Sequence, residues 1–256
     1  MIGWLCYEQE NAERNAWLIK RLIELFQGRG ISLILKTDID GENPDFAIVR
    51  AIRPDWNMRL QARGVKVFNN PETSAFCNDK FLSYTQANAW GIPVLATQLL
   101  GEPTNYPCVV KSVDGHGGAE VFWADKKEDF IKAKSCLKDK KYILQKPSKT
   151  LGKDMRIYAL GGKIIACVLR TSQTSFKSNY SLGGMVKLVA PTKKQREIVK
   201  RLYEKLRFDF VGIDFIKDGN RWVFNEMEDP VGARMLYAVS KIDIAEKLTE
   251  YIVKKL

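Results

Sequence analysis

Apolar positions follow two different periods along the first third of the chain. Two predicted helices, at residues 11–27 and 55–63, carry apolar side chains at helical spacing, and Gly28 and Gly30 end the first of them. Short apolar runs with the length of buried strands lie around these helices, at residues 2–7, 31–35, 46–49 and 65–68. This alternation predicts a small α/β unit with a parallel sheet.

The rest of the chain is richer in strands. The segment Gly161-Gly162 is typical of a two-residue hairpin between its flanking strands. Strands are predicted at residues 108–113, 119–123, 142–145, 154–160, 163–169 and 184–189, with a hairpin over 211–228. Helices are predicted at residues 78–90, 124–137 and 192–206, and an amphipathic helix at the end of the chain.

These patterns divide the chain into three parts. We expect an N-terminal α/β lobe over residues 1–75, a small lobe with a glycine-rich loop over residues 76–141, and a strand-rich lobe over residues 142–256. Ligand sites commonly lie between such lobes.

Composition is that of a globular protein with a full-sized core. Of its 256 residues, 45% are hydrophobic and 28% are charged. The five cysteines are far apart, without metal-ligand spacing, and are typical of core thiols in a reducing compartment. The first charged residues, Glu8 and Glu10, are acidic, unlike a signal peptide, and no apolar run reaches the roughly twenty residues of a membrane span. We expect a cytoplasmic location.

The net charge of +11 is the one unusual bulk property. It agrees with a nucleic-acid-binding surface or with a site for a polyanionic small molecule. Lysines and arginines alternate with acids at residues 126–129 and 193–207, which favours a solvated surface over a nucleic-acid patch. Nucleic acid is therefore not the expected partner, and binding that weakens steeply with salt would be its signature.

A strand-borne lysine, Lys111, precedes a loop that contains Gly115, Gly117 and Gly118. Glycines let backbone amides approach phosphate oxygens, and the lysine adds a positive charge. The spacing matches neither the Walker A motif nor G-x-G-x-x-G, and a simple β-turn is an equally good interpretation of the loop alone. His116, the single histidine, is interpreted as packing over phosphate or facing solvent rather than as catalytic.

Three carboxylates are predicted to share one face of the 211–228 hairpin. If its loop has three residues, Asp214 faces Phe224, and Asp214, Glu226 and Glu228 then point the same way. Unit charges about 4 Å apart repel by about 4 kcal/mol at an effective dielectric constant of about 20, so a cation is required, and oxygen ligands favour Mg²⁺. A loop of two or four residues would instead separate Asp214 from the glutamates and favour surface salt bridges.

A third group of charged residues lies on the strands before this hairpin. Lys153, Asp154 and Arg156 belong to one strand, Arg170 ends the next, and Asn179 follows. Arginine suits bidentate binding of carboxylate and phosphate, although each residue taken singly is more often a surface charge.

In this order the segments resemble the ATP-grasp superfamily, in particular its branch of glutamate ligases and bacterial glutathione synthetases. The resemblance covers about residues 70–235 and rests on seven segments. They are Asn78-Asp79-Lys80, Val110-Lys111 with the glycine loop, residues 143–147, residues 153–156, Arg170, Asn179 with Gly183-Gly184, and Gly212-Ile213-Asp214 with Glu226-Met227-Glu228. It implies an α/β ATP-grasp fold with a parallel N-terminal sheet and an antiparallel C-terminal sheet.

The resemblance implies a role for each matching residue. ATP would contact two phosphate-gripping lysines, a loop that closes over the phosphates, a hinge at the adenine and two further strand residues. These are Lys80, Lys111, Gly115, His116, Gly117, Gly118, Gln145, Lys146, Pro147, Lys153 and Asp154. Two Mg²⁺ ions, with Mn²⁺ as an alternative, would be held by Asp214, Glu226 and Glu228.

Reaction roles would fall to Arg170 and Asn179, which would face the transferred phosphoryl group and the acyl intermediate, and to Arg156, near a substrate carboxylate. Glu228 departs from the family, which usually has asparagine there. Arg234 is interpreted either as a substrate-carboxylate ligand or as an ion-pair partner of Asp229.

The implied activity is an ADP-forming carboxylate–amine ligase that works through an acyl phosphate on amino-acid or peptide substrates. The N-terminal lobe would contribute to substrate selection, with Arg50 and Arg53 placed either for that purpose or to cap the sheet. An ATP-binding sensor or scaffold without turnover is the alternative. Related ligases often form dimers or tetramers, so a homo-oligomer is an open alternative to a monomer.

Overall fold

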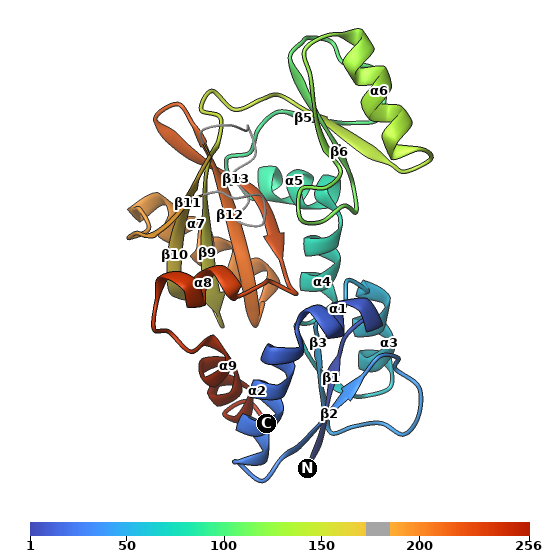
Figure 1. Ribbon diagram of the computed structural model, residues 1–256, viewed down its shortest axis with the longest axis vertical. Helices are drawn as coiled ribbons and strands as arrows, with labels where there is room; N and C mark the ends of the chain where they lie inside the picture. Colours follow the sequence, from blue (N-terminus) through green and yellow to red (C-terminus); the bar gives the residue numbers. More distant parts are fainter. Residues whose placement is uncertain (173–184) are drawn as a thin grey trace.

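A computed structural model describes residues 1–172 and 185–256 of the chain. Within them the chain forms three separate β-sheets, each with its own helices. Figure 1 shows the lobes one above another along the long axis, with the small lobe at one end and both chain termini at the other. The mixed α/β class predicted from the sequence is confirmed. None of the helices in these two ranges is both long and apolar enough to cross a membrane.

The N-terminal lobe is built on a parallel four-stranded sheet of order β2-β1-β3-β4, as predicted. Its elements are β1 (Ile2–Cys6), α1 (Gln9–Arg14), α2 (Ala16–Gln27), β2 (Ser32–Lys36), β3 (Phe46–Val49), α3 (Pro54–Ala62) and β4 (Lys66–Phe68). The single helix predicted over residues 11–27 is wrong, because the backbone of Asn15 leaves the helical region and separates α1 from α2.

The small lobe is an antiparallel four-stranded sheet of order β5-β8-β6-β7, and α6 packs on it. Its elements are β5 (Thr97–Leu99), β6 (Cys108–Ser112), β7 (Val121–Ala124), α6 (Lys127–Leu137) and β8 (Tyr142–Gln145). Two helices, α4 (Pro71–Asn78) and α5 (Lys80–Ala89), connect it to the N-terminal lobe. The predicted boundary at residue 75 falls inside α4, and the lobe boundaries stay a prediction.

The C-terminal lobe is an antiparallel five-stranded sheet of order β11-β10-β9-β12-β13, as predicted. Its elements are β9 (Lys153–Leu160), β10 (Lys163–Thr171), β11 (Met185–Leu188), α7 (Lys193–Leu206), β12 (Phe210–Asp218), β13 (Arg221–Glu228), α8 (Arg234–Val239) and α9 (Ile244–Val253). The apolar side of α7 packs with Ile157, Ile213 and Phe215. Because side chains alternate along strands, the neighbouring polar residues of β9 and β12 point to the opposite face.

The β12–β13 hairpin corrects the predicted register. Its turn has two residues, so Asp218 pairs with Arg221 and Phe215 with Phe224. A bulge then makes Asn225 the extra residue, and Asp214 pairs with Glu226 instead of Phe224. The predicted three-residue loop is therefore wrong. The bulge nevertheless returns Asp214 and Glu226 to the same face, which a two-residue turn without it would not do.

The C-terminal segment ties the ends of the chain together. Helix α9 packs against α2, where Asp243 accepts from Arg21, and Glu246 pairs with Arg29. One hydrophobic core contains Leu22 and Phe26 of α2 together with Tyr158 and Leu248. The N-terminal and C-terminal lobes thus share a buried core, which holds the two lobes together around the cavities described below.

Candidate active site

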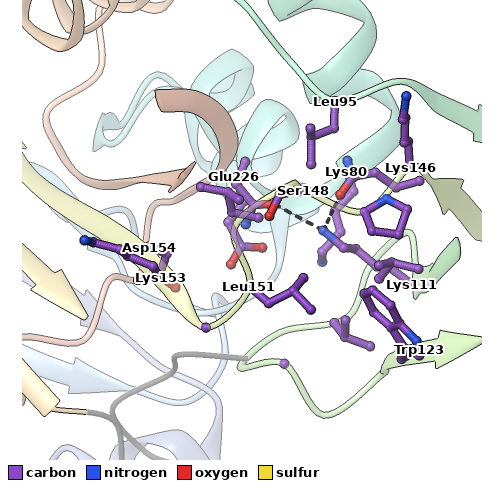
Figure 2. Close-up of a pocket in the computed structure, with 18 of the residues that line it drawn as sticks. Lys80, Leu95, Lys111, Trp123, Lys146, Ser148, Leu151, Lys153, Asp154 and Glu226 are labelled. Carbon is purple, nitrogen blue, oxygen red and sulfur yellow. Dashed lines mark hydrogen bonds between the residues drawn. The ribbon is translucent and has the colours of Figure 1, made fainter. Parts of the chain in front are cut away.

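A cavity of about 840 Å³, including its mouth, lies where the small lobe meets the C-terminal sheet (Figure 2). We call it the hinge cavity because it follows the connection from β8 to β9. Charged and polar groups line part of it, and apolar side chains line the rest. Its principal residues are Lys80, Leu95, Val109, Lys111, Gly115, Gly118, Trp123, Gln145, Lys146, Pro147, Leu151, Lys153, Asp154, Asn225 and Glu226.

Lys111 is the hub of this cavity. Its ammonium donates to Gln145 Oε1 at 2.8 Å, to Asn225 Oδ1 at 3.1 Å and to the Tyr84 hydroxyl at 3.4 Å. Gln145 belongs to the small lobe and Asn225 to the C-terminal sheet, so the ammonium links two lobes. Burial lowers the pKa of Lys111 to about 8, although Glu226 opposes the shift. The protonated form of Lys111 is therefore less favoured here than it is in water.

The glycine-rich loop folds back onto the end of β6. Lys80 donates its side-chain hydrogen bond to the Gly115 carbonyl. A Cβ on Gly115 would come within 2.0 Å of Ser112 Oγ and 2.7 Å of Glu120 Oε2, so a larger residue would have to displace both side chains. Gly117 and Gly118 have positive φ angles, which glycine adopts without a steric cost. The loop therefore presents backbone rather than side chains to the hinge cavity at Gly115 and Gly118.

The hinge segment supplies carbonyl groups and an apolar wall. The Lys146 N–H already donates to Ala96 O at 2.9 Å, and Pro147 has no N–H. Leu95, Val109 and Trp123 form flat apolar surfaces beside this segment. A planar, partly polar group fits such a surface.

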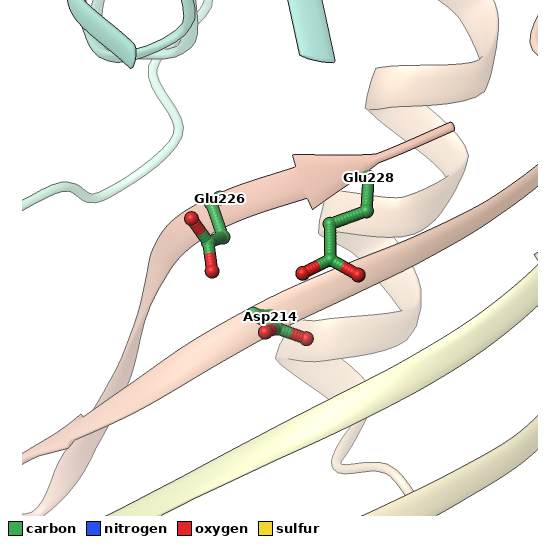
Figure 3. A group of neighbouring side chains, drawn as sticks. All are labelled: Asp214, Glu226 and Glu228. Carbon is green, nitrogen blue, oxygen red and sulfur yellow. The ribbon is translucent and has the colours of Figure 1, made fainter. Parts of the chain in front are cut away.

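Three carboxylates gather on the adjacent hairpin. Figure 3 shows Asp214 on β12 facing Glu226 and Glu228 on β13. One oxygen from each of the three lies within 4.8 Å of the others. Asp214 is buried, and the two glutamates are half-buried. Hard oxygen donors at this separation fit Mg²⁺, which is commonly held by carboxylates together with substrate phosphates.

Two buried arginines partly neutralise these acids. Arg156 binds both oxygens of Asp214 at 2.7 Å and reaches Glu228 Oε1 at 2.7 Å. Arg170 pairs with Asp154 and donates to Asp214 at 2.7 Å. Burial raises the pKa of Asp214, but the two arginines outweigh it and hold the pKa at about 2. Glu228, where the family usually has asparagine, is thus matched by a charge of opposite sign.

A second cavity of about 1,090 Å³ lies on the other side of this ion-pair network, and we call it the arginine cavity. Four arginines from three parts of the chain line it, together with one acid and the single histidine. Its principal residues are Asn11, Arg14, Asn15, His116, Gly117, Arg156, Arg170, Glu228 and Arg234. Gly115 and Gly118 face the hinge cavity, whereas His116 and Gly117 face the arginine cavity. The glycine loop therefore contributes to both.

Arg14 and Arg234 are the exposed charges of the arginine cavity. No carboxylate among residues 1–172 and 185–256 pairs with either of them. Asp229, the alternative partner predicted for Arg234, is buried and instead accepts from Asn78 Nδ2 at 3.2 Å. Both guanidinium groups are available to an anionic ligand.

Most of the described residues singled out in the sequence line one of these two cavities. Asp214 lines neither but binds Arg156 and Arg170 of the arginine cavity, whereas Arg50 and Arg53 lie elsewhere. Arg50 is buried and donates to the Tyr7 hydroxyl at 2.6 Å and to Val231 O at 2.8 Å, away from both cavities. Arg53 forms a surface ion pair with Asp55 and lines neither cavity. Asn179, with Gly183 and Gly184, lies outside the described residues.

Other lining residues carried no recognisable signal in the sequence. Asn11 and Arg14 come from α1, a short helix far from the motifs in sequence, and reach the arginine cavity only through lobe packing. Asn225 reaches Lys111 because of the bulge. The only sequence feature that could have indicated Arg14 is its charge on the polar side of an N-terminal helix.

Comparison with known proteins supports a common origin for this arrangement. A model of the RimK-like ATP-grasp domain matches residues 89–252. N-acetylaspartylglutamate synthase A of Homo sapiens is 28% identical over 270 residues, covering 96% of this chain and 69% of that protein. Glutamate--LysW ligase ArgX of Sulfurisphaera tokodaii is 26% identical over 213 residues, covering 75% and 74%.

A solved structure shares the fold at low sequence identity. The ATP-grasp ligase PsnB, complexed with a minimal precursor, Mg and ADP, superposes with a TM-score of 0.71 at 14% identity and covers 99% of this chain and 96% of its own. The family model spans more than half of the chain, and its relatives are synthases and ligases. The chain therefore belongs to the RimK-like ATP-grasp family and is an ATP-dependent carboxylate–amine ligase.

Proposed function

We propose that the enzyme binds Mg-ATP in the hinge cavity and joins an acidic amino acid to a carboxylate held in the arginine cavity. The observation that carries this proposal is the shared wall of the two cavities. The glycine loop lines both, and the Asp154–Arg170 ion pair has its acid in the hinge cavity and its arginine in the arginine cavity, so a phosphoryl group leaving ATP would meet a carboxylate at that wall.

The hinge cavity suits ATP at both ends. Adenine would lie against Leu95, Val109 and Trp123, and its amino group would donate to a hinge carbonyl because the Lys146 N–H is engaged. Lys80, Lys111 and the loop amides would meet the phosphates. Mg²⁺ would be held by Asp214, Glu226 and Glu228, where it neutralises charge on the transferring phosphoryl group.

Arg156 and Arg170 act at the acyl end in this scheme. A carboxylate is a poor electrophile, and phosphorylation converts it to an acyl phosphate that an amine can attack. Both arginines are buried and held by acids, which keeps their guanidinium groups oriented before substrate arrives. Preorganised donors of this kind stabilise developing charge without reorganising.

The charge of the arginine cavity supports acidic substrates. Arg14 and Arg234, on opposite lobes, have no ion-pair partner in the described part of the chain and would bind carboxylates remote from the reacting one. Two relatives are named for products or substrates that contain glutamate. Glutamate, with two carboxylates and one amine, matches this surplus of positive charge.

The test is ADP release from Mg-ATP with pooled N-acetylated amino acids, dicarboxylic acids and dipeptides, with and without L-glutamate. Glu226→Gln should abolish release, because it removes one metal ligand without unpairing an arginine. Asp214→Asn should do the same, at an additional cost in stability. Asp209→Asn changes a buried acid that binds Tyr251 and Lys255 away from both cavities, and it should keep turnover.

Wild-type turnover that persists in both Glu226→Gln and Asp214→Asn would overturn the metal assignment. ADP release that never depends on any carboxylate in the pool would overturn the ligase proposal for these substrates. Thermal unfolding of each variant separates loss of chemistry from loss of fold.

A further inference from the structure

His116 lies on the acceptor side of the active site, not on the nucleotide side. It follows Gly115, which lines the hinge cavity, yet His116 lines the arginine cavity together with Arg156, Arg170 and Glu228. These three residues surround the point where the acyl phosphate would form. A side chain that only covered the ATP phosphates would line the hinge cavity instead.

The imidazole also has a vacant polar atom. Nε2 of His116 is buried and has no hydrogen-bond partner within residues 1–172 and 185–256. An unsatisfied buried polar atom costs about 1–3 kcal/mol, so its persistence in a substrate cavity indicates a partner supplied by a ligand.

The ligase reaction needs a proton acceptor at this place. Amino groups are mostly protonated at neutral pH, and an ammonium has no lone pair with which to attack. Forming the amide removes two protons from that nitrogen. One can leave on the departing phosphate, but the first must be taken before the carbon–nitrogen bond forms.

The other titratable groups of the arginine cavity are poor acceptors. Its four arginines stay protonated. Glu228 is bound to Arg156 and belongs to the candidate metal cluster. Asp214, beneath the cavity, is held by two arginines. Among the described residues that line this cavity, His116 remains as the group whose ring nitrogen can accept a proton.

The surroundings of His116 favour its neutral form. Burial lowers the pKa of His116, and the nearby Lys80 lowers it further, against smaller opposing effects of Glu226, Asp114 and Glu8. A neutral imidazole at physiological pH can accept a proton without first losing one.

We propose that His116 is the catalytic base that deprotonates the attacking amine, an inference that rests on the proposed ligase function. Nε2 takes one proton from the ammonium of the amino acid. The freed lone pair forms the carbon–nitrogen bond, the carbon–oxygen bond to phosphate breaks, and phosphate leaves with that electron pair and the second proton. The imidazolium then returns its proton to solvent.

The experiment compares two nucleophiles that differ in their need for a base. L-Glutamate carries an ammonium, whereas hydroxylamine is mostly uncharged at neutral pH and attacks acyl phosphates directly to give a hydroxamate. Wild type, His116→Gln and His116→Ala receive Mg-ATP, pooled N-acetylated amino acids and dicarboxylic acids, and one nucleophile. We expect kcat for amide formation to fall about 100-fold in both variants, while hydroxamate formation stays within about twofold of wild type.

A second readout is rescue. Added imidazole should restore part of the amide-forming rate of His116→Ala, whose shortened side chain leaves space, and should not affect His116→Gln. If the rates of amide and hydroxamate formation fall by the same factor, His116 acts in loop closure or phosphate binding, and the proposal is overturned. Unchanged amide formation in His116→Gln would also overturn it. Absence of both products with wild type would instead contradict the proposed function itself.

Discussion

At the scale of single residues, Lys111 carries a positive charge whose burial is energetically unfavourable in the free enzyme. Its ammonium is buried among Gln145, Asn225 and Tyr84, and no carboxylate in residues 1–172 or 185–256 forms an ion pair with it. A pKa lowered from 10.5 to about 8 means that the native fold disfavours the charged form by roughly 3 kcal/mol. An anionic phosphate would remove that penalty by supplying the missing negative charge.

We therefore predict that ATP affinity depends on the protonation of Lys111. The pKa in the free enzyme is depressed to about 8, so the charge is present below that pH and is lost as pH rises through it. The dissociation constant of ATP should rise roughly tenfold between pH 7.5 and pH 9, because a single proton controls one phosphate contact. Isothermal titration calorimetry over that range measures it.

The matched control is Lys111→Arg, whose guanidinium stays charged at every pH in the range. Its ATP affinity should be almost independent of pH, whatever its absolute value. Equal pH slopes for wild type and this variant would show that another group controls the dependence.

At the scale of elements, the β12–β13 hairpin decides the chemistry of the site by one extra residue. A two-residue turn places Phe215 opposite Phe224, and an uninterrupted ladder would then put Glu226 and Glu228 on the face of Ile213. The bulge at Asn225 absorbs one residue, so Glu226 faces Asp214 instead. It also directs the Asn225 amide toward Lys111 at 3.1 Å.

This geometry predicts different outcomes for two single-residue deletions. Without Asn225 the strand becomes regular, and Glu226 and Glu228 keep their face, so Mg²⁺-dependent ADP release should persist with a higher KM for ATP. Without Met227, Glu228 should turn to the opposite face, and ADP release should be lost. Steady-state kinetics at varied ATP and Mg²⁺ distinguishes the two.

The substitution Asn225→Ala serves as the control, since it removes the contacts of the Asn225 amide with Lys111 and Tyr84 but leaves the number of residues in the strand unchanged. Should deletion of Asn225 abolish turnover while Asn225→Ala retains it, the bulge itself would be required and the register argument would fail. Circular dichroism and thermal unfolding establish that each variant is folded.

At the scale of the whole molecule, the lobes are joined by buried contacts rather than by linkers alone. Arg50, at the end of β3, donates across to Val231 O in the C-terminal lobe, and α9 packs on α2. One core includes residues of both lobes. Such an interface holds Arg14 of α1 at the arginine cavity.

We predict that substitution of Arg50 lowers the stability of the fold. Substitution of Arg53 should have little effect on stability and none on catalysis. Arg50→Met should lower the free energy of unfolding by about 2–3 kcal/mol, since it leaves the Val231 carbonyl and the Tyr7 hydroxyl without their charged donor. Arg53→Met removes an exposed ion pair with Asp55 and a cation–π contact with Trp56, and it should cost about 1 kcal/mol. Urea denaturation measures both.

Neither variant should change the KM for ATP or for the acid substrates, because neither arginine lines the hinge cavity or the arginine cavity. A large rise in the KM for an acid substrate in Arg53→Met would instead support the role in substrate selection predicted from the sequence. Equal destabilisation by the two substitutions would contradict the bridging role of Arg50.

The sequence by itself determined the classes of element and the chemistry of the site. Short apolar runs, glycines at turns and helical spacing are local properties, so the parallel and antiparallel sheets followed from them. Motifs such as Lys111 with its glycine loop, and Glu226 with Glu228, carried their chemistry in residue type and order. These features need no knowledge of distant contacts.

Only the tertiary structure decided which residues meet. The bulge at Asn225, the approach of Arg14 from α1, the burial of Arg50 and the place of His116 at the arginine cavity all depend on packing between segments far apart in the chain. Hydrogen-bond register and lobe contacts are set by the whole molecule's balance of burial and pairing. A local pattern cannot encode that balance, which is why the loop length was predicted wrongly while the shared face of the acids was predicted correctly.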